Sequence, residues 1–275
     1  MALKNPALSN NPAFRPAKGT IATTDADGAQ ATGLATAAGL QQLYDAPSAT
    51  AADTDRMTYG DTIGKTAIMF VVLLATATVA WFIPALTIPG AIIGLVLGLV
   101  NAFKKKPSPL LILLYAAAEG LFIGGISSIF EQLWGGVVMQ AVLATLAVVT
   151  VTLVLFASGK IRASKKATKV FLIAMVGYLV FSLVNVGLMM FGGVSSSMAF
   201  GLRSQLVFGI PLGIIIGILA VLMAAYSLVL DFDFIKNAVR NRAPRVMGWY
   251  GGFGLMVTIV WLYIEFLRMF AIARN

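Results

Sequence analysis

A long apolar run near the end of the chain decides which class of protein this is. Residues 206–235 read LVFGIPLGIIIGILAVLMAAYSLVLDFDFI, so the run ends in two carboxylates, Asp231 and Asp233. At about 1.5 Å of rise per residue, a helix of this length crosses the hydrocarbon core of a bilayer. A carboxylate at membrane depth costs about 2.5–3.5 kcal/mol. Asp231 is therefore predicted to serve an ion pathway or a proton relay.

The composition of the whole chain supports a membrane protein. Hydrophobic residues make up 59% of the chain and charged residues 11%, whereas a soluble domain has about 25% charged residues. Residues 57–275 are predicted to form an all-α membrane domain with seven transmembrane helices, at about 66–86, 88–103, 109–130, 137–157, 170–191, 206–231 and 247–272. Residues 1–56 have no sustained apolar period and are predicted to be a disordered cytoplasmic tail.

The chain has no Cys and no His. This excludes disulfides, thiol and imidazole catalysis and the usual zinc ligands. No cofactor is expected, and a response to pH near neutrality must come from carboxylates. Two sets of glycines at four-residue intervals indicate close helix packing in lipid: Gly90, Gly94 and Gly98, and then Gly209, Gly213 and Gly217.

The basic residues predict the orientation of the protein in the membrane. Three, five and four of them lie in the connections at 104–106, 160–169 and 236–245, whereas the opposite side has Arg203 alone. The positive-inside rule then places the N-terminus in the cytoplasm and the C-terminus outside. We expect an integral protein of a bacterial plasma membrane, and the net charge of +9 is not taken as a sign of nucleic-acid binding.

Four carboxylates are predicted to lie within the spans: Glu119, Asp231, Asp233 and Glu265. Helical rise places Asp231 about 7 Å, Glu119 about 20 Å and Glu265 about 24 Å from the basic ends of their helices. Such a series lets a cation exchange its hydration shell in steps, so these three residues are candidate transient calcium ligands. Structural interpretations stay open, because Asp233 suits the membrane interface and Glu265 can pair with Arg268 at i, i+3.

Three segments resemble the Bax inhibitor/YccA-like (TMBIM) transmembrane family over about residues 57–275: Ala118–Gly124, Leu230–Ile235 and Leu262–Leu267. The resemblance implies a central C-terminal helix wrapped by the other six. It also implies a pH-sensitive calcium leak sensed by a carboxylate pair, which would be Asp231 and Glu265 here. The chain departs from the family in having Glu at 265, Phe232-Asp233 after the first Asp, and 34 positions between the pair.

The leading hypothesis is a pH-sensitive calcium leak channel gated by intramembrane carboxylates, which is not an enzyme. The alternative is a membrane interaction protein that regulates a membrane-anchored protease or a stress response, with the N-terminal tail as its handle. Proton-coupled transport stays open because buried carboxylates serve it equally well. An intramembrane aspartyl protease is disfavoured, since the chain has no Gly-x-Gly-Asp sequence. The expected partners are the lipid bilayer and calcium ions, with a membrane-anchored protease as a further candidate.

Overall fold

The computed structural model describes residues 55–193 and 198–274, and seven long helices dominate this part of the chain. They are α3 (Tyr59–Phe82), α4 (Thr87–Phe103), α5 (Pro109–Leu133), α6 (Val137–Ala157), α7 (Lys165–Met190), α8 (Leu212–Arg240) and α9 (Met247–Arg274). Each is long and apolar enough to cross a membrane, α4 together with the preceding 3-10 turn η2 (Pro84–Leu86). The predicted all-α membrane fold is confirmed. The predicted tail at 1–56 lies outside the described residues apart from its last two positions.

Two helices begin several residues before the predicted positions because a hydroxyl caps each of them. Thr58 accepts a hydrogen bond from the backbone N–H of Asp61 at 3.1 Å, so α3 begins at Tyr59. Ser164 accepts one from the N–H of Ala167 at 3.2 Å, so α7 begins at Lys165. A capping hydroxyl satisfies one of the free N–H groups of the first turn and extends the helix toward it. Some of the lysines predicted to lie in the loop before α7 therefore lie in the helix itself.

The sixth span begins at Leu212, and the prediction that it starts near Leu206 is wrong. The preceding residues form a small antiparallel hairpin of β1 (Leu206–Val207) and β2 (Ile210–Pro211). Its two turn residues, Phe208 and Gly209, have φ values of 54° and 81°. Two-residue hairpin turns of this kind need positive φ at both positions. Gly209 therefore lies in a turn and is not part of the predicted glycine stripe. The other two members of that stripe, Gly213 and Gly217, pack against α9.

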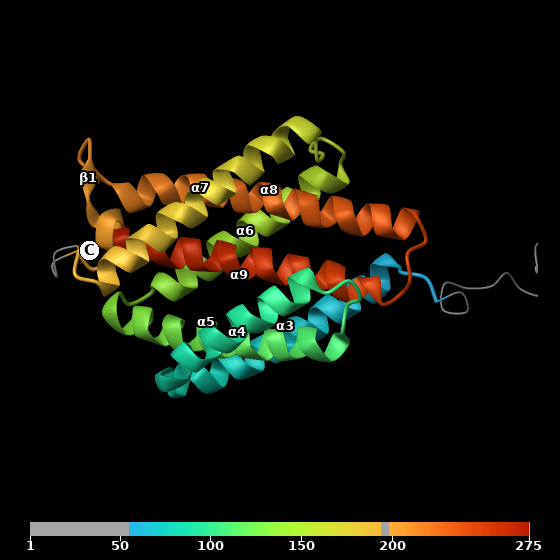
Figure 1. Cartoon of the computed structure of the whole chain (residues 1–275), viewed down its shortest axis with the longest axis horizontal. Helices are drawn as coiled ribbons and strands as arrows, with labels where there is room; N and C mark the ends of the chain where they lie inside the picture. Colours follow the sequence, from blue (N-terminus) through green and yellow to red (C-terminus); the bar gives the residue numbers. More distant parts are fainter. Residues whose placement is uncertain (1–54, 194–197, 275) are drawn as a thin grey trace, which may run out of the picture. The chain divides into compact units, whose positions relative to one another are not determined.

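Helix α9 lies in the middle of the helices (Figure 1) and packs against α3, α5, α6 and α8. Fourteen of its residues are buried. By contrast, α4 packs mainly on α5, and α7 packs on α8 and on the short 3-10 turn η3 (Gly201–Ser204). The expected central C-terminal helix is confirmed, although its contacts with the other six helices are unequal.

Glycines let α5 approach two neighbouring helices closely. A Cβ atom built on Gly124 would lie 2.0 Å from the carbonyl oxygen of Ala77 in α3. On the other side, a Cβ atom on Gly90 of α4 would lie 2.8 Å from the backbone nitrogen of Phe122. Small residues at such crossings allow backbones to touch, which drives helix association in lipid. The predicted stripe of Gly90, Gly94 and Gly98 is confirmed, since all three face α5.

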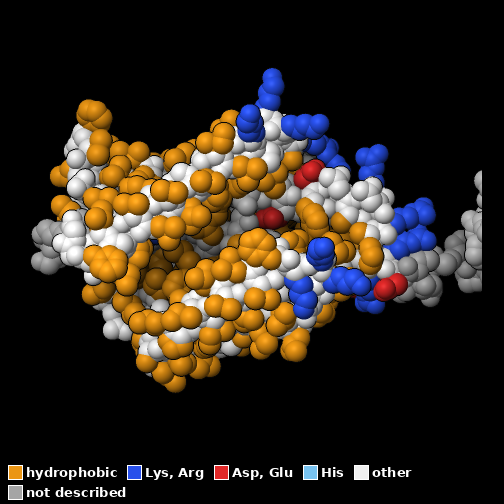
Figure 2. Space-filling view, in the orientation of Figure 1, with side chains coloured by type: hydrophobic (Ala, Val, Ile, Leu, Met, Phe, Trp, Pro, Cys, Tyr) orange, Lys and Arg blue, Asp and Glu red, His pale blue; other side chains and the backbone are white. Residues whose placement is uncertain are grey.

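Basic side chains gather at one end of the helices, whereas hydrophobic side chains cover most of the rest of the visible face, with an acidic side chain near its middle (Figure 2). Three connections supply them, after α4, α6 and α8. At the same end, the N–H of Met57 donates to the carbonyl of Ala243 at 2.8 Å, which ties the chain before α3 to the connection between α8 and α9. We refer to this end as the basic end.

Replacing Gly124 by Ala should destabilise the protein by about 1–3 kcal/mol, because the added methyl group meets the backbone of α3. The matched control is Gly177→Ala in α7, where a Cβ atom meets nothing within 4 Å. The control should be neutral or stabilising by about 0.5–1 kcal/mol, as expected for Gly→Ala within a helix. Thermal unfolding in detergent micelles compares the two. Equal stability of both variants would contradict the close α3–α5 crossing.

Candidate functional site

One face of the central helix collects polar and charged side chains. Gly254, Thr258, Trp261, Glu265 and Arg268 follow one another at intervals of four, three, four and three residues. This spacing puts them on one face of a helix. We call this set the polar face of α9. Its side chains contact residues of α8 near the basic end and a residue of α7 further along.

Asp231 of α8 lies against the part of the polar face nearer the basic end. Its Oδ2 atom accepts a hydrogen bond from Thr258 Oγ1 at 2.7 Å, and Thr258 Oγ1 lies 3.1 Å from Ser227 Oγ. A Cβ atom on Gly254 would lie 2.8 Å from Asp231 Oδ1. A larger residue at 254 would therefore displace the carboxylate. These hydrogen-bonding partners are neutral, so Asp231 can gain or lose a charge without breaking an ion pair with them.

Glu265 lies further along the same face, with 1% of its surface exposed. Its Oε1 atom accepts hydrogen bonds from Tyr178 of α7, from Arg268, and from Trp261 Nε1 at 3.2 Å. Its Oε2 atom is buried without a partner among the described residues. The pairing of Glu265 with Arg268 at i, i+3, which the sequence left open, is present.

Arg203 completes this cluster from outside the long helices. It lies in η3 and is 2% exposed. Its Nη2 atom donates to Ser182 Oγ at 3.0 Å and to Tyr178 Oη at 3.3 Å, and its guanidinium lies over the rings of Tyr178 and Phe181. Arg203 lies in the connection between α7 and α8, as the sequence predicted, but its burial in this cluster was not predicted. Asn185 holds the turn by accepting from the N–H of Leu202 at 2.7 Å.

The far half of the polar face therefore holds a cluster with an excess of positive charge. We define the arginine cluster as Arg203, Arg268, Tyr178 and Glu265. Two guanidinium groups face one carboxylate, and Nη1 of Arg203 is buried without a partner among the described residues. A buried charge needs countercharge and hydrogen bonds to offset its desolvation. Glu265 supplies both, so it serves as the anionic centre of the cluster.

Asp231 and Glu265 are not joined by any hydrogen bond or ion pair within 55–193 and 198–274. Thr258, the partner of Asp231, lies seven residues before Glu265, which is about 10 Å along the helix. Helix α8 continues past Lys236 to Arg240. The two carboxylates therefore lie at different depths along α9, with Asp231 against the polar face and Glu265 on it, in agreement with the depths estimated from helical rise.

The other two predicted carboxylates lie away from the polar face. Glu119 of α5 is half-buried at the crossing with α4, where a Cβ atom on Gly94 would lie 3.2 Å from its Oε1 atom. Asp233 accepts a hydrogen bond from Asn237 at 2.9 Å and lines a surface cavity beside the first turns of α7, which agrees with the interfacial interpretation. In the described part of the chain, no three acidic side chains group into a metal site.

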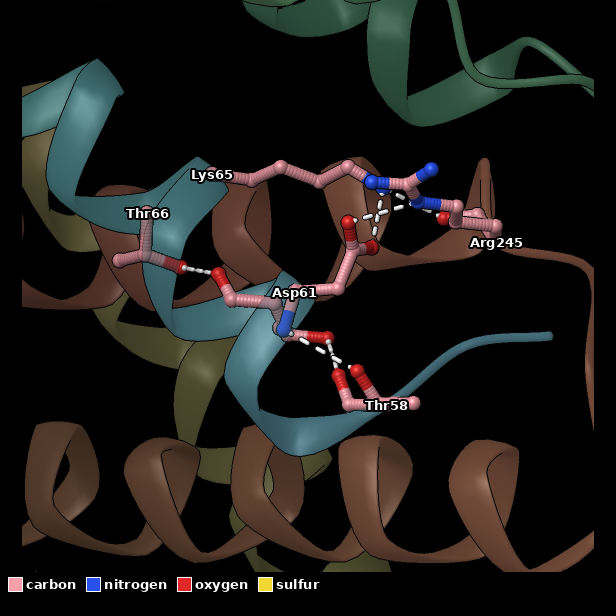
Figure 3. A network of polar contacts seen from close by, with 6 residues as sticks. Thr58, Asp61, Lys65, Thr66 and Arg245 are labelled. Atoms are coloured by element: carbon pink, nitrogen blue, oxygen red, sulfur yellow. Dashed lines mark hydrogen bonds and ion pairs between the residues drawn. The ribbon is translucent and has the colours of Figure 1, made fainter. Parts of the chain in front are cut away.

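A further group of polar side chains joins two segments at the basic end (Figure 3). Asp61 pairs with Lys65 at 2.5 Å and with Arg245 at 2.9 Å, and Lys65 donates to the carbonyl of Arg245 at 2.6 Å. The hydrogen bond to Asp61 and the charge of that carboxylate raise the pKa of the Arg245 guanidinium. This group joins the start of α3 to the connection before α9. Asp61 and Arg245 are 184 positions apart, so no local pattern predicts their contact.

The contacts of Glu131 join the end of α5 to the start of α6. It lies in the last turn of α5 and accepts from the backbone N–H groups of Gly136 at 2.6 Å and Val138 at 3.1 Å. A carboxylate at this position satisfies the free N–H groups at the start of α6 and complements the helix dipole. The role of Glu131 is thus to fix the connection between two helices.

Comparison with known proteins supplies the family. A comparison with curated proteins gave no match. The family described as Bax inhibitor 1 like matches residues 5–275, which is nearly the whole chain. The seven membrane-spanning helices and the central α9 agree with that match. The chain belongs to the Bax inhibitor 1 like family of integral membrane proteins.

Proposed function

We propose that this protein is a pH-sensitive leak pathway for cations, with calcium as the permeant ion, and that the described arrangement is its closed form. The polar face of α9 carries the proposal, since it holds Glu265 and the partner of Asp231 about 10 Å apart inside the domain. Ionisable groups within a membrane mark ion or proton pathways by default. The proposal includes no catalytic step and no cofactor.

The arginine cluster supports a closed form. A cation that passes Asp231 along the polar face next meets two guanidinium groups and one carboxylate. The excess positive charge repels it, and a pair of like charges at 4 Å costs about 4 kcal/mol at an effective dielectric constant of 20. Opening then requires Tyr178 or the arginines to move. Tyr178 lies on α7, the span with the smallest buried share at 11%, which makes α7 the best candidate for a moving part.

The pH response is assigned to carboxylates because the chain has no histidine. Asp231 is the first of them that a cation from the basic end would meet on the polar face. Its hydrogen-bonding partners are neutral, so protonation removes the negative charge that attracts a cation there. The basic end is assigned to the cytoplasm by the positive-inside rule. The N-terminus is then cytoplasmic as well.

Replacing Asp231 by Asn should lower calcium flux into proteoliposomes by roughly tenfold and flatten its dependence on pH between about 5 and 8. The reason is that a lost charge at this depth changes the energy of the ion by more than about 1.4 kcal/mol. The control is Asp233→Asn, two positions away at the surface, which should keep both flux and pH response. The proposal is wrong if neither variant nor the intact protein gives flux above empty liposomes.

Replacing Arg203 by Gln should raise calcium flux, by roughly tenfold or more, because the cluster loses its excess positive charge. Arg203→Lys keeps the charge and should leave the leak low. The matched control is Arg274→Gln, since Arg274 is exposed and donates to the backbone at Trp134 and Gly135. The same flux assay measures all three. A leak that is equal in Arg203→Gln and Arg274→Gln would show that Arg203 does not close the pathway.

Replacing Glu265 by Gln should destabilise the closed form by about 3–5 kcal/mol, because the partly buried Arg268 loses its ion-pair partner and the buried Arg203 loses the nearby countercharge. Adding Arg268→Gln to that variant should recover part of the loss, since one of the unpaired charges is then removed. Thermal unfolding in detergent micelles measures the double variant and each of the two single variants, Glu265→Gln and Arg268→Gln. If the double variant is as unstable as the sum of the single ones, Glu265 and Arg268 do not stabilise each other.

A further inference from the structure

A lengthwise groove separates α3 from α6 over the surface of α9. It consists of two adjoining cavities of about 650 and 680 Å³, and Phe70 of α3 lines both of them. The cavity nearer the basic end is formed by residues of α3, α6, α8 and α9 together with Arg162. We call this cavity the basic-end groove. It lies apart from the polar face, since none of the five residues of that face lines it.

The walls of the basic-end groove are apolar. Ile63, Ala67 and Phe70 line it from α3, with Leu153 from α6 and Leu255 from α9. Two threonine hydroxyls line it, those of Thr62 and Thr66, and each donates to a backbone carbonyl of its own helix at 2.8 Å. The other side chains with polar donors that line the groove are Tyr59, the first residue of α3, and the two cations Arg162 and Lys236. Its chemistry therefore suits a hydrocarbon chain.

The length of the groove matches one leaflet of a bilayer. Its α3 wall extends from Tyr59 to Phe70, which is about 16 Å of helix. The hydrocarbon core of a bilayer is about 30 Å thick, so half of it is about 15 Å. A single acyl chain that enters at the basic end would reach Phe70 near the bilayer centre.

Two cations from different parts of the chain meet at the mouth of the groove. Arg162 lies in the connection between α6 and α7, and Lys236 lies in α8. Both lie over the ring of Phe156. The guanidinium carbon of Arg162 is 6.0 Å from the centroid of this ring, and Nζ of Lys236 is 5.8 Å from it. Neither forms an ion pair with an acidic residue among the described residues. The mouth is thus a convergent positive site above an apolar groove.

We propose that the basic-end groove binds one phospholipid with an anionic headgroup. The phosphate lies between Arg162 and Lys236, and one acyl chain lies between α3 and α6 as far as Phe70. Basic pockets between transmembrane helices recognise anionic headgroups in this way. The proposal goes beyond ion conduction, and its test measures lipid binding, so its failure would leave the proposed leak pathway untouched.

The test is native mass spectrometry of the full chain in detergent, with phosphatidylglycerol or phosphatidylcholine added at the same acyl composition. The intact protein should bind phosphatidylglycerol more tightly. Arg162→Ala with Lys236→Ala should weaken phosphatidylglycerol binding by roughly 30-fold, at about 1 kcal/mol per basic residue, and should leave phosphatidylcholine binding nearly unchanged. The matched control is Lys104→Ala with Lys105→Ala, which removes two charges from the connection after α4 and should bind both lipids as the intact protein does.

A second variant tests the acyl chain itself. Ala67 is exposed on the groove wall, so Ala67→Trp should fill the groove and reduce the binding of both lipids by several fold without lowering the thermal stability. The proposal is overturned if the two double variants lose phosphatidylglycerol equally, which would indicate general attraction to a basic surface. It is also overturned if Ala67→Trp binds both lipids as tightly as the intact protein does.

Discussion

Charged groups inside a membrane domain need partners from the protein itself, and this constraint governs the half of the structure around α9. Lipid offers neither countercharge nor hydrogen bonds. Glu265 therefore draws together Arg268 from its own helix and Tyr178 from α7, and Tyr178 in turn contacts Arg203 from η3. Helix α7 has little buried surface of its own. It packs on α8 and η3, and the hydrogen bonds of Tyr178 join it to α9.

A second constraint is space for the carboxylates that are only half-buried. Asp231 and Glu119 each face a glycine on the neighbouring helix, Gly254 of α9 and Gly94 of α4. In both cases a Cβ atom on the glycine would lie about 3 Å from a carboxylate oxygen. Glycine thus does two things in this fold. It allows helices to cross closely, as at Gly124, and it leaves room for an acidic side chain between helices.

The central helix has two different surfaces, which the two proposals use separately. Its polar face is directed to Asp231 of α8 and Tyr178 of α7. Leu255 lines the basic-end groove between α3 and α6, one position after Gly254. A lipid in the groove would therefore touch the residue beside the glycine that makes room for Asp231. The two sites are neighbours on α9 although they do not share a residue.

The sequence alone was enough to predict the membrane class, the seven spans and the residues that are costly to bury, because apolar runs and isolated charges are local properties. It also predicted the glycine stripe of α4 and the possible pairing of Glu265 with Arg268, which depend on spacing within one helix. It failed at Leu206, where turn geometry at Phe208 and Gly209 outweighed hydrophobicity.

The packing of the helices in three dimensions sets which distant groups meet. It gave Asp231 the hydroxyl of Thr258 instead of a second carboxylate, and it buried Arg203 in the cluster of Glu265. It also brought Arg162 and Lys236 to one ring. These contacts join residues from different helices and loops, and the rotation and depth of each helix are set by packing against its neighbours, which no local pattern specifies.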